Sequence, residues 1–553
     1  MIYPKIALAQ SILEIFLAKE ITTIIISPGS RNAPLTIGFA SNPSFKSYSI
    51  ADERCAAFFA LGIAQQTKKP TVLVCTSGSA LLNYYPAIAE AFYSEIPLIV
   101  VSADRPQSKI DIGDGQTIRQ ENVFINHTVY NANLTENASV ENDVKINEAI
   151  EMAISKKGPV HINAPFEEPL YETVSALSVH SFISTSVKEN QTTAIPNLEE
   201  LLSSWNKASK KMILVGVNEP NSISAPTIET FGNDESVVVF TETTSNLHHP
   251  TFIDHIDTLI TPFNDGDFAQ LQPDILVTFG GMIVSKRIKA FLRKYKPKEH
   301  WHIDILRAYD TFGALSNHIK MEPNAFFDTF LKKTQVMHSD YYSNIEKVVE
   351  LRKIRTNEYL SKIEFSDFKV FEKVIGSLPK NSQLQISNSS AIRYAQLITI
   401  DETIEVFCNR GTSGIDGSTS TAIGAAHASE KQTVFITGDI GFLYDSNALW
   451  NNYIPKNFKI ILVNNGGGGI FRILPGHQEA PVFNTFFETS HKFTAEHLAK
   501  MYQFEYLKAT DEDTLTESLE LLYAKNDAPC ILEVFTPTIV NDLVLMQFFR
   551  ELV

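Results

Sequence analysis

The segments Thr433-Val-Phe-Ile-Thr-Gly-Asp439 and Lys459-Ile-Ile-Leu-Val-Asn-Asn465 decide the fold of this chain. Each begins with five residues that are mostly β-branched or apolar and lack polar alternation, which is typical of strands buried on both faces of a parallel sheet. Each then ends in a polar pair, and 25 residues lie between Asp439 and Asn465. Ligands of open parallel sheets bind at the carboxyl ends of the strands. The two polar pairs are therefore expected at one binding edge.

The chemistry of these two pairs favours a metal ion that is shared with a phosphate group. Asp439, the Asn465 side chain and a loop carbonyl are hard oxygen donors, which suit Mg²⁺. The Gly466–Gly469 run that follows allows the backbone to approach a bulky anion closely. Asp and Asn are also ordinary turn formers, and either pair alone would be read as a strand-end turn. Their spacing before a glycine run favours the metal–diphosphate interpretation.

The same alternation of strand and helix extends over the whole chain. A first series of strands is expected at Thr22–Ser27, Tyr48–Ala51, Thr71–Cys75, Leu98–Ser102 and Val160–Asn163, with a helix at Ser79–Tyr93. A second series is expected at Met212–Val217, Val237–Phe240, Ile275–Phe279 and His302–Ile305, followed by a charged helix at Tyr341–Phe368. A third is expected at Gln383–Ser387, Ile404–Cys408, Thr433–Thr437, Lys459–Val463 and Cys530–Phe535. The polar stretch Ser184–Asn197 reads as a linker.

These series predict an α/β protein with three consecutive α/β domains and mainly parallel central sheets. We expect the domains at residues 1–183, 197–340 and 365–553. A chain of 553 residues is too long for one hydrophobic core, which agrees with this division.

Composition excludes several classes of function. Lys+Arg 47 against Asp+Glu 63 gives a net charge of −16, which argues against a general nucleic-acid binder. No apolar run approaches the roughly 18 residues of a membrane helix, so no membrane insertion is expected. The four cysteines lie far apart without metal-site spacing, as expected for reduced, buried thiols in the cytoplasm: Cys55, Cys75, Cys408 and Cys530.

The Gly438-Asp439 and Asn464-Asn465 pairs resemble the signature of thiamine-diphosphate enzymes, and the fold expected is the thiamine-diphosphate-binding fold. The signature usually has a glycine directly after the aspartate, where this chain has Ile440. Such enzymes also need a carboxylate, carried by their first α/β domain, against the aminopyrimidine ring of the cofactor. Glu53 follows a predicted strand, and Asp52, the residue directly before it, is expected to cap the next helix. Without the signature, Glu53 would be read as a solvated residue of a first helical turn.

Further motifs narrow the resemblance. Ser27-Pro-Gly-Ser-Arg-Asn-Ala-Pro-Leu35, Ala103-Asp-Arg-Pro106, Gln116-Thr-Ile-Arg-Gln120, Ser285-Lys-Arg287, Asn409-Arg-Gly-Thr-Ser-Gly-Ile-Asp-Gly417 and Gly469-Ile-Phe471 occur in this order. Over essentially its whole length the chain is similar to the 2-succinyl-5-enolpyruvyl-6-hydroxy-3-cyclohexene-1-carboxylate (SEPHCHC) synthases of menaquinone biosynthesis. Where members of that family have an Asn before the Gln of the third motif, this chain has Gly115.

The resemblance implies a role for each matching position. Asp439, the Asn465 side chain and the Gly467 carbonyl would bind Mg²⁺, with Mn²⁺ as the alternative ion. Glu53 would activate thiamine diphosphate, and the other cofactor contacts would be Ser389, Ser413, Ile415, Gly438, Ile470 and Phe471. Arg393 and Arg410 would act in catalysis and bind the succinyl part of the substrate. The isochorismate surface would comprise Ser30, Arg31, Arg105, Gln116, Lys286 and Arg287.

The resemblance also implies the reaction and the assembly. It implies decarboxylation of 2-oxoglutarate and 1,4-addition of the resulting succinyl carbanion to isochorismate, giving SEPHCHC and CO₂. The active sites would lie at the subunit interface of a homodimer or homotetramer. Both substrates are dicarboxylates, which an acidic protein must bind with locally concentrated arginine.

Two other functions remain open from the sequence. One is a different thiamine-dependent lyase, for instance a carboligase similar to acetolactate synthase, which would share Glu53 and the two polar pairs but not the arginine set. The other is a nucleotide-binding regulatory module that uses Gly466–Gly469. That loop lacks the glycine pattern and the downstream acid of dinucleotide sites.

Overall fold

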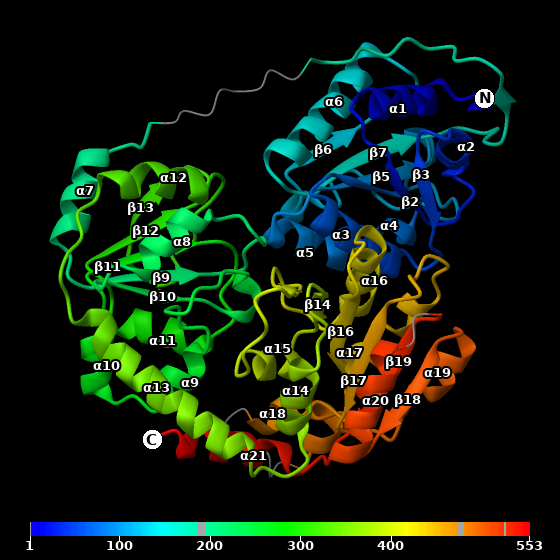
Figure 1. Ribbon diagram of the computed structural model, residues 1–553. Coiled ribbons are helices and arrows are strands. Elements are labelled where there is room, and N and C mark those ends of the chain that lie inside the picture. Colours follow the sequence, from blue (N-terminus) through cyan, green and yellow to red (C-terminus); the bar gives the residue numbers. More distant parts are fainter. Residues whose placement is uncertain (1, 186–193, 474–480, 525–526) are drawn as a thin grey trace.

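The computed structural model describes residues 2–185, 194–473, 481–524 and 527–553. The chain forms three α/β units, coloured blue to cyan, green, and yellow to red in Figure 1. The predicted linker Ser184–Asn197 falls in part on residues 186–193, which lie outside the described residues. Among the described helices, none is both long and apolar enough to cross a membrane.

The first unit has a six-stranded sheet with the order β3-β2-β4-β5-β7-β6, and all of its pairs are parallel. The strands are β2 (Thr23–Ile26), β3 (Lys46–Ser49), β4 (Thr71–Cys75), β5 (Leu98–Asp104), β6 (Tyr130–Asn133) and β7 (Val160–Pro165). The helices are α1 (Ala7–Ala18), α2 (Ala33–Ser41), α3 (Glu53–Thr67), α4 (Ser79–Asn83), α5 (Tyr85–Ser94) and α6 (Val140–Ser155). A short antiparallel ladder joins β1 (Tyr3–Pro4) to β8 (Thr173–Val174).

The predicted single helix Ser79–Tyr93 is wrong. It is two helices, α4 and α5, which meet at Tyr84. Pro86 lies in the first turn of α5 and has no N–H to continue the hydrogen-bond ladder of α4.

The middle unit has a five-stranded parallel sheet with the order β10-β9-β11-β12-β13. Its strands are β9 (Lys211–Val215), β10 (Val237–Phe240), β11 (Ile275–Phe279), β12 (Glu299–Ile303) and β13 (Leu315–Ile319). Its helices are α7 (Leu198–Lys207), α8 (Ala225–Gly232), α9 (Ile256–Ile260), α10 (Asp265–Leu271), α11 (Lys286–Lys294) and α12 (Pro323–Phe330).

The third unit repeats the six-stranded parallel design, with the order β15-β14-β16-β17-β19-β18. Its strands are β14 (Gln383–Ile386), β15 (Glu405–Phe407), β16 (Thr433–Gly438), β17 (Lys459–Asn464), β18 (Glu505–Ala509) and β19 (Cys530–Phe535). Its helices are α14 (Asp367–Gly376), α15 (Ser390–Ala395), α16 (Ser418–Ala428), α17 (Asp439–Tyr444), α18 (Ile470–Ile473), α19 (Glu496–Met501), α20 (Glu512–Ala524) and α21 (Asn541–Glu551). The three sheets confirm the predicted α/β class with mainly parallel strands.

The long helix α13 (Tyr341–Leu360) links the middle and third units along the lower edge of Figure 1. The predicted charged helix Tyr341–Phe368 is therefore too long. The chain leaves the helix after Leu360, and Ser366 caps the start of α14 by accepting a hydrogen bond from the Lys369 N–H.

The first and third units pack directly on each other through α3 and α16 (Figure 1). A Cβ atom on Gly62 would lie 2.1 Å from the Thr421 carbonyl oxygen, and one on Gly424 would lie 2.1 Å from the Phe59 carbonyl oxygen. Both helices therefore need glycine at the crossing. One buried apolar cluster runs through the contact and includes Phe58, Phe59, Ala422 and Ile423.

Candidate functional site

The predicted acid Glu53 is the first residue of α3. The Asp52 side chain caps this helix by accepting a hydrogen bond from the Cys55 N–H at 3.2 Å. Asp52 also accepts from Asn447 of the third unit at 2.9 Å, and Arg54 donates to the Tyr444 carbonyl at 3.0 Å. The residues on either side of Glu53 are thus tied to the third unit. Glu53 itself stays in the first unit, where its carboxylate accepts from Asn83 at 3.4 Å.

Glu53, Ser30 and Gln116 line one cavity of about 560 Å³, although they come from three separate sequence motifs. The cavity lies where the loops after β2 and β4 leave the carboxyl edge of the first sheet. Gly78, which also lines it, has φ +90°, and a Cβ atom there would lie 3.3 Å from the Gln116 carbonyl oxygen. All residues that line this cavity belong to the first unit.

The two other predicted residues of the first unit, Arg31 and Arg105, lie outside the lining of that cavity. Arg31 is 3% exposed, and its guanidinium donates to the Phe166 carbonyl at 2.9 Å and to the Glu168 carboxylate at 3.2 Å. The Nε atoms of both arginines are buried without a hydrogen-bond partner among the described residues. The two terminal nitrogens of Arg31 are therefore engaged within the first unit, while its Nε, like that of Arg105, has no partner among the described residues.

Asp439 lies in a turn at the carboxyl edge of the third sheet, where several backbone N–H groups donate to its carboxylate. It begins α17 directly after β16, and it is 3% exposed. One carboxylate oxygen accepts from the N–H groups of Gly466 and Gly467, both at 2.9 Å, and the other accepts from the Ile440 N–H at 2.7 Å. The strand ends of β16 and β17, which are paired in the sheet, thus meet as the sequence predicts.

Asn465 lies beside Asp439 and has an unusual hydrogen-bond inventory. Its Nδ2 donates to the Asp367 carboxylate at 2.9 Å, while its Oδ1 is buried without a partner among the described residues. A buried amide oxygen of this kind is an acceptor that a bound cation could use. A Cβ atom on the neighbouring Gly438 would meet open space. The predicted metal ligands Asp439, Asn465 and Gly467 therefore adjoin one another, and this donor set fits a hard divalent cation.

Charged residues around this turn have shifted pKa values. His491 Nε2 lies 3.3 Å from the Asp439 carboxylate, and this adjacent acid raises the pKa of His491. Burial raises the pKa of Asp367 to about 6. Among the described residues, no cluster of three or more His, Cys, Asp or Glu side chains could hold a metal ion. A cation at Asp439 would therefore depend on the amide and carbonyl oxygens.

The predicted loop Asn409–Gly417 is held by the buried Asn388. Asn388 accepts from the Arg410 guanidinium at 2.7 Å and donates to the carbonyl oxygens of Asn409 and Gly414, both at 2.7 Å. Ser389 and Ser413 have left-handed backbones, with φ 69° and 60°. Ile415 faces α17, because its Cβ would lie 3.8 Å from a Cβ built on Gly441.

The predicted cations of the second and third units converge. Burial lowers the pKa of Arg393, the nearby charge of Arg410 lowers it further, and Asp257 opposes both. Burial raises the pKa of Asp257, while Arg287 and Arg393 both lower it. Arg287 and Arg393 therefore lie in the neighbourhood of the same buried acid, Asp257, and Arg410 lies near Arg393. Lys286 lies next to Arg287 at the start of α11, and the Arg287 guanidinium lies 5.1 Å from the centre of the Phe549 ring.

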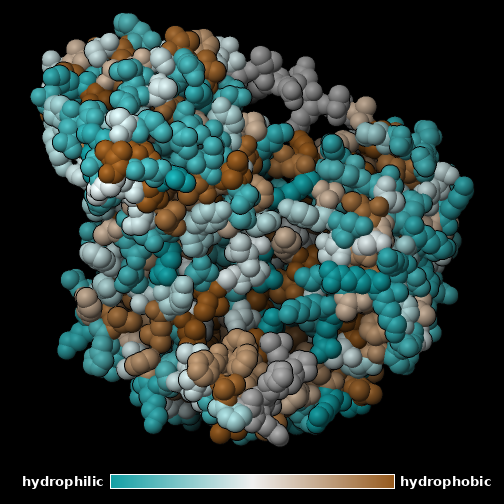
Figure 2. Space-filling model, turned by 180° about the vertical axis from the view of Figure 1, so that it is seen from behind, coloured by the Kyte–Doolittle hydropathy of each residue, from teal (hydrophilic) through white to brown (hydrophobic). Residues whose placement is uncertain are grey.

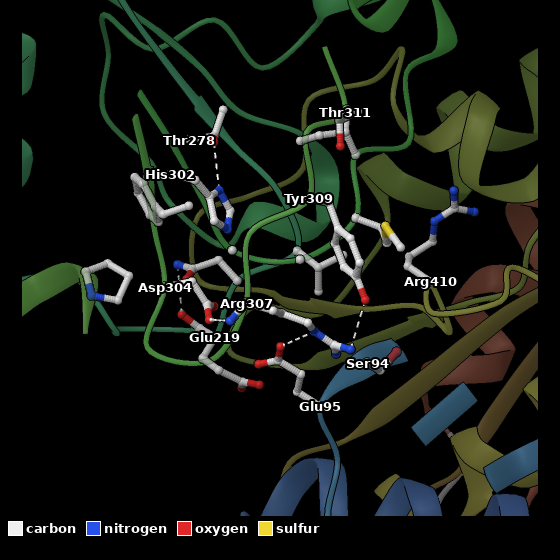
Figure 3. Close-up of a pocket in the computed structure, with 18 of the residues that line it drawn as sticks. Ser94, Glu95, Glu219, Thr278, His302, Asp304, Arg307, Tyr309, Thr311 and Arg410 are labelled. Atoms are coloured by element: carbon white, nitrogen blue, oxygen red, sulfur yellow. Dashed lines mark hydrogen bonds and ion pairs between the residues drawn. The ribbon is translucent and has the colours of Figure 1, made fainter. Parts of the chain in front are cut away.

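Arg410 also borders a cavity of about 370 Å³ at which all three units meet. Figure 3 shows Arg410 on one side of this cavity and Asp304 and His302 on the other, with Arg307 and Glu95 below them. Lys289 of α11 lines the same cavity. The last two predicted residues, Ile470 and Phe471, begin α18. Ile470 is buried, and the Phe471 ring lies 6.0 Å from that of Phe487.

Sequence reasoning missed several residues that contact the predicted ones: Asn83, Glu90, Asp367 and His491. No motif marks Asn83, Asp367 or His491. Glu90 had a signal, because it is the single charge in the otherwise apolar segment Tyr85–Tyr93. An acid at such a position must be paired or hydrogen-bonded if the segment is buried.

Comparison with known proteins agrees with this geometry. Residues 6–127 match the family model of the thiamine pyrophosphate enzyme N-terminal TPP binding domain, and residues 389–534 match that of the C-terminal TPP binding domain. The first segment contains Glu53, and the second contains Asp439, Asn465 and the Arg410 loop.

Curated relatives match the chain over its full length. A 2-succinyl-5-enolpyruvyl-6-hydroxy-3-cyclohexene-1-carboxylate synthase of Flavobacterium johnsoniae is 74% identical over 553 residues, which cover 100% of both chains. The synthase of Flavobacterium psychrophilum is 66% identical, again over 100% of both chains. That of Porphyromonas gingivalis is 37% identical over 97% of this chain and 96% of its own. The chain therefore belongs to the 2-succinyl-5-enolpyruvyl-6-hydroxy-3-cyclohexene-1-carboxylate synthase family of thiamine pyrophosphate enzymes.

Proposed function

We propose that this enzyme decarboxylates 2-oxoglutarate and joins the remaining succinyl fragment to isochorismate by 1,4-addition. The observation that carries the proposal is a pair of sites, one suited to each end of the cofactor. The third unit offers Asp439 with the unpaired Asn465 oxygen, and the first unit offers a cavity that contains Glu53. One end suits a metal-bound diphosphate and the other suits the aminopyrimidine ring of thiamine.

The third unit would hold the cofactor's diphosphate. Asp439, Asn465 Oδ1 and the Gly467 carbonyl would bind Mg²⁺, or Mn²⁺ in its place. Gly438, Ser389 and Ser413 would lie against the cofactor, and Ile415 would support its rings. Thiamine diphosphate supplies the electron sink that decarboxylation of a 2-oxo acid requires. Glu53 would hold a proton at its carboxylate oxygen and exchange it with the aminopyrimidine nitrogen.

The arginine cluster would bind the carboxylates of the substrates. Arg393 and Arg410 would orient 2-oxoglutarate, and Ile470 and Phe471 would exclude water from that part of the site. An arginine about 4 Å from a carboxylate gains roughly 4 kcal/mol at an effective dielectric of 20, before desolvation is subtracted. Isochorismate would be bound by Ser30, Arg31, Arg105 and Gln116 from the first unit and by Lys286 and Arg287 from the middle unit. At Gly115, a backbone N–H would replace the side-chain contact found elsewhere in the family.

The active site would be completed by a second copy of the chain, in a dimer or a tetramer. Two observations support this arrangement. The cavity that contains Glu53 is lined by residues of the first unit alone. Its lining therefore does not include the residues of the third unit that would bind the diphosphate. Large apolar side chains of the third unit are exposed in the single chain, among them Phe486 at 75%, Phe493 at 66% and Ile539 at 70%. Figure 2 shows brown apolar patches among polar residues over one face of the molecule.

The domain boundaries and the cellular location belong to the same proposal. Residues 1–183, 197–340 and 365–553 each contain one complete parallel sheet, which supports their assignment as domains. The four cysteines are buried and form no disulfide bond among the described residues, which supports a reducing compartment such as the cytoplasm.

The decisive experiment is incubation of the protein with 2-oxoglutarate, isochorismate, thiamine diphosphate and Mg²⁺, with the mass of the product read directly. We expect the adduct of isochorismate and the succinyl fragment, and release of CO₂. Pyruvate in place of 2-oxoglutarate is the matched control and should give no adduct. Turnover of pyruvate, or no turnover of 2-oxoglutarate, would contradict the proposed substrates. Thiamine diphosphate with Mg²⁺, but not NAD or ATP, should also raise the melting temperature.

A further inference from the structure

Glu90 is a buried acid of the first unit that contacts the arginine-bearing loop of the third. It lies on α5 and is 1% exposed. Its Oε1 accepts from the Gly411 N–H at 2.7 Å and from the Ser94 hydroxyl at 2.7 Å. Its Oε2 accepts from the N–H and the hydroxyl of Thr412, at 2.6 and 2.7 Å. Four donors therefore meet one carboxylate, and two of them are consecutive backbone N–H groups.

No Lys, Arg or His side chain forms an ion pair with Glu90 among the described residues. A buried carboxylate without a counter-ion is unfavourable unless hydrogen-bond donors replace its hydration. Consecutive backbone N–H groups form such an anion-binding concavity. The loop thus supplies the hydrogen-bond donors that the Glu90 carboxylate needs, and the same hydrogen bonds hold the loop in place.

The loop has little freedom to lie elsewhere. A Cβ atom on Gly411 would lie 2.6 Å from the Glu90 carbonyl oxygen, so the loop backbone approaches α5 as closely as glycine allows. On its other side, Asn388 holds the Arg410 guanidinium and the Gly414 carbonyl. Arg410 is therefore placed between two fixed groups, Asn388 in the third unit and Glu90 in the first.

The helix that carries Glu90 is itself anchored by the middle unit. Arg307 donates to the carbonyl oxygens of Phe92 and Tyr93, at 2.8 and 3.1 Å, and to the Glu95 carboxylate at 2.5 Å. An arginine in this place satisfies carbonyl groups that the end of α5 leaves unpaired. Figure 3 shows the Arg307–Glu95 pair below the cavity whose far side carries Arg410.

We propose that Glu90 is a positioning residue for the reaction. Glu90 fixes the backbone conformation of residues 410–415, and this conformation determines the positions of the Arg410 and Ile415 side chains. This inference rests on the proposed function, in which Arg410 binds 2-oxoglutarate and Ile415 supports the cofactor. Glu90 contacts neither ligand in this proposal and acts only through the loop.

The test compares Glu90→Gln with Glu95→Gln in the full-length protein loaded with thiamine diphosphate and Mg²⁺. Gln at position 90 keeps the size of the side chain but places an NH₂ donor against N–H donors, so one contact must fail. Glu95→Gln is the matched control, because it removes a carboxylate at the end of the same helix while its amide oxygen can still accept from Arg307 and so keep the anchor of α5. Among the described residues, Glu95 has no contact with the loop. Hydrogen exchange of peptides that cover residues 409–417 reports the loop directly.

We expect Glu90→Gln to increase exchange in residues 409–417, with little change elsewhere. The KM for 2-oxoglutarate should rise about 10- to 100-fold, as for a misplaced binding group, while the KM for isochorismate changes less than threefold. Mere partial unfolding would lower kcat and leave both KM values unchanged. Thr412→Val, which removes one of the four donors, should give a smaller effect in the same direction. Glu95→Gln should leave both KM values and the loop exchange within twofold.

Two results would overturn the inference. Unchanged exchange in residues 409–417 of Glu90→Gln would show that the acid does not hold the loop. Increased exchange with unchanged kinetics would show that the loop position is irrelevant to the reaction. If Glu90→Gln does not fold, Thr412→Val carries the same two readouts. Failure of the proposed function is distinguishable, because Arg410→Ala would then be kinetically silent whatever the exchange of the loop.

Discussion

The side-chain amide of Asn465 donates to the buried carboxylate of Asp367 at 2.9 Å, and this contact fixes which way the amide lies. Asp367 also accepts from the Thr536 hydroxyl at 2.5 Å, so its two oxygens are both engaged. Because Nδ2 is used in this way, the oxygen of Asn465 remains on the other side as an acceptor with no partner in the described part of the chain. An outer residue therefore prepares a candidate metal ligand.

Asp367→Ala should weaken Mg²⁺ binding about 10- to 100-fold, because outer partners of metal ligands have effects of this size. Asp367→Asn can still accept from Asn465 and should lose less. Titration of Mg²⁺ at saturating thiamine diphosphate, followed by calorimetry, measures this without any assay of activity. Equal Mg²⁺ affinity in the wild type and both variants would remove Asp367 from the metal site.

Glu53→Gln should lower kcat by a factor of about 10² to 10⁴, because it removes the carboxylate that we propose to transfer the proton but keeps its shape. Glu53 is half-buried and accepts one long hydrogen bond from Asn83, so the melting temperature should change little. Steady-state rates with both substrates, together with a melting curve, check both parts. Full activity of this variant would contradict the role of Glu53.

Arg410→Ala should reduce kcat/KM for 2-oxoglutarate by about 100-fold or more, which corresponds to roughly 3 kcal/mol of lost transition-state stabilisation. Arg410→Lys retains the charge but not the planar fork and should recover only part of the loss. The measurement is steady-state kinetics with 2-oxoglutarate varied. A large fall in melting temperature with unaltered kinetics would mean that Arg410 serves only the fold.

Stability should depend on pH through Glu242, a buried acid that accepts from the N–H groups of Val284 and Ser285 at the start of α11. Burial raises the pKa of Glu242 from 4.5 to about 7, against the lowering effect of those two N–H groups. Between these values the native protein binds more protons than the unfolded chain, so the unfolding free energy falls as pH rises and is level above pH 7.

Glu242→Gln lacks this titration. The stability of the wild type relative to Glu242→Gln should therefore decrease from pH 5 to pH 8, by up to about 3 kcal/mol. Melting temperatures of both proteins across this range measure it. A constant difference between them would show that Glu242 does not titrate in this window.

Mixed assemblies test the shared active site. Glu53→Gln and Asp439→Asn chains should each be inactive alone. If each site takes Glu53 from one chain and Asp439 from the other, mixing the two under conditions that exchange subunits should restore about a quarter of the wild-type activity. A mixture that remains inactive, with subunit exchange verified by mass spectrometry, would place both residues of a site in the same chain.

The sequence predicts the fold where strands are buried on both faces. Val237–Phe240, Ile275–Phe279 and Cys530–Phe535 are found with their predicted bounds. Three of the missed strands, β6, β13 and β18, are edge strands of their sheets, and polar side chains interrupt their apolar pattern. An edge strand needs no continuous apolar run, because one of its sides is open to water.

The residues of the candidate site likewise divide into those that a local sequence pattern marks and those that it does not. Motif residues such as Asp439 and Asn465 were predictable, because their neighbours in sequence show where the strands end. Asp367 and Glu90 were not, because their partners lie 98 and 321 residues away along the chain. Contacts of that separation are set by how helices and sheets pack, and a single sequence carries no local pattern for them.

The glycine contact between α3 and α16 has a consequence for how ligands enter and leave. Gly62 and Gly424 bring the two backbones together with no side chain between them, so the first and third units of one chain are closely packed at this helix crossing. In the proposed assembly, in which the cofactor lies between two chains, it would therefore enter and leave at the interface between those chains.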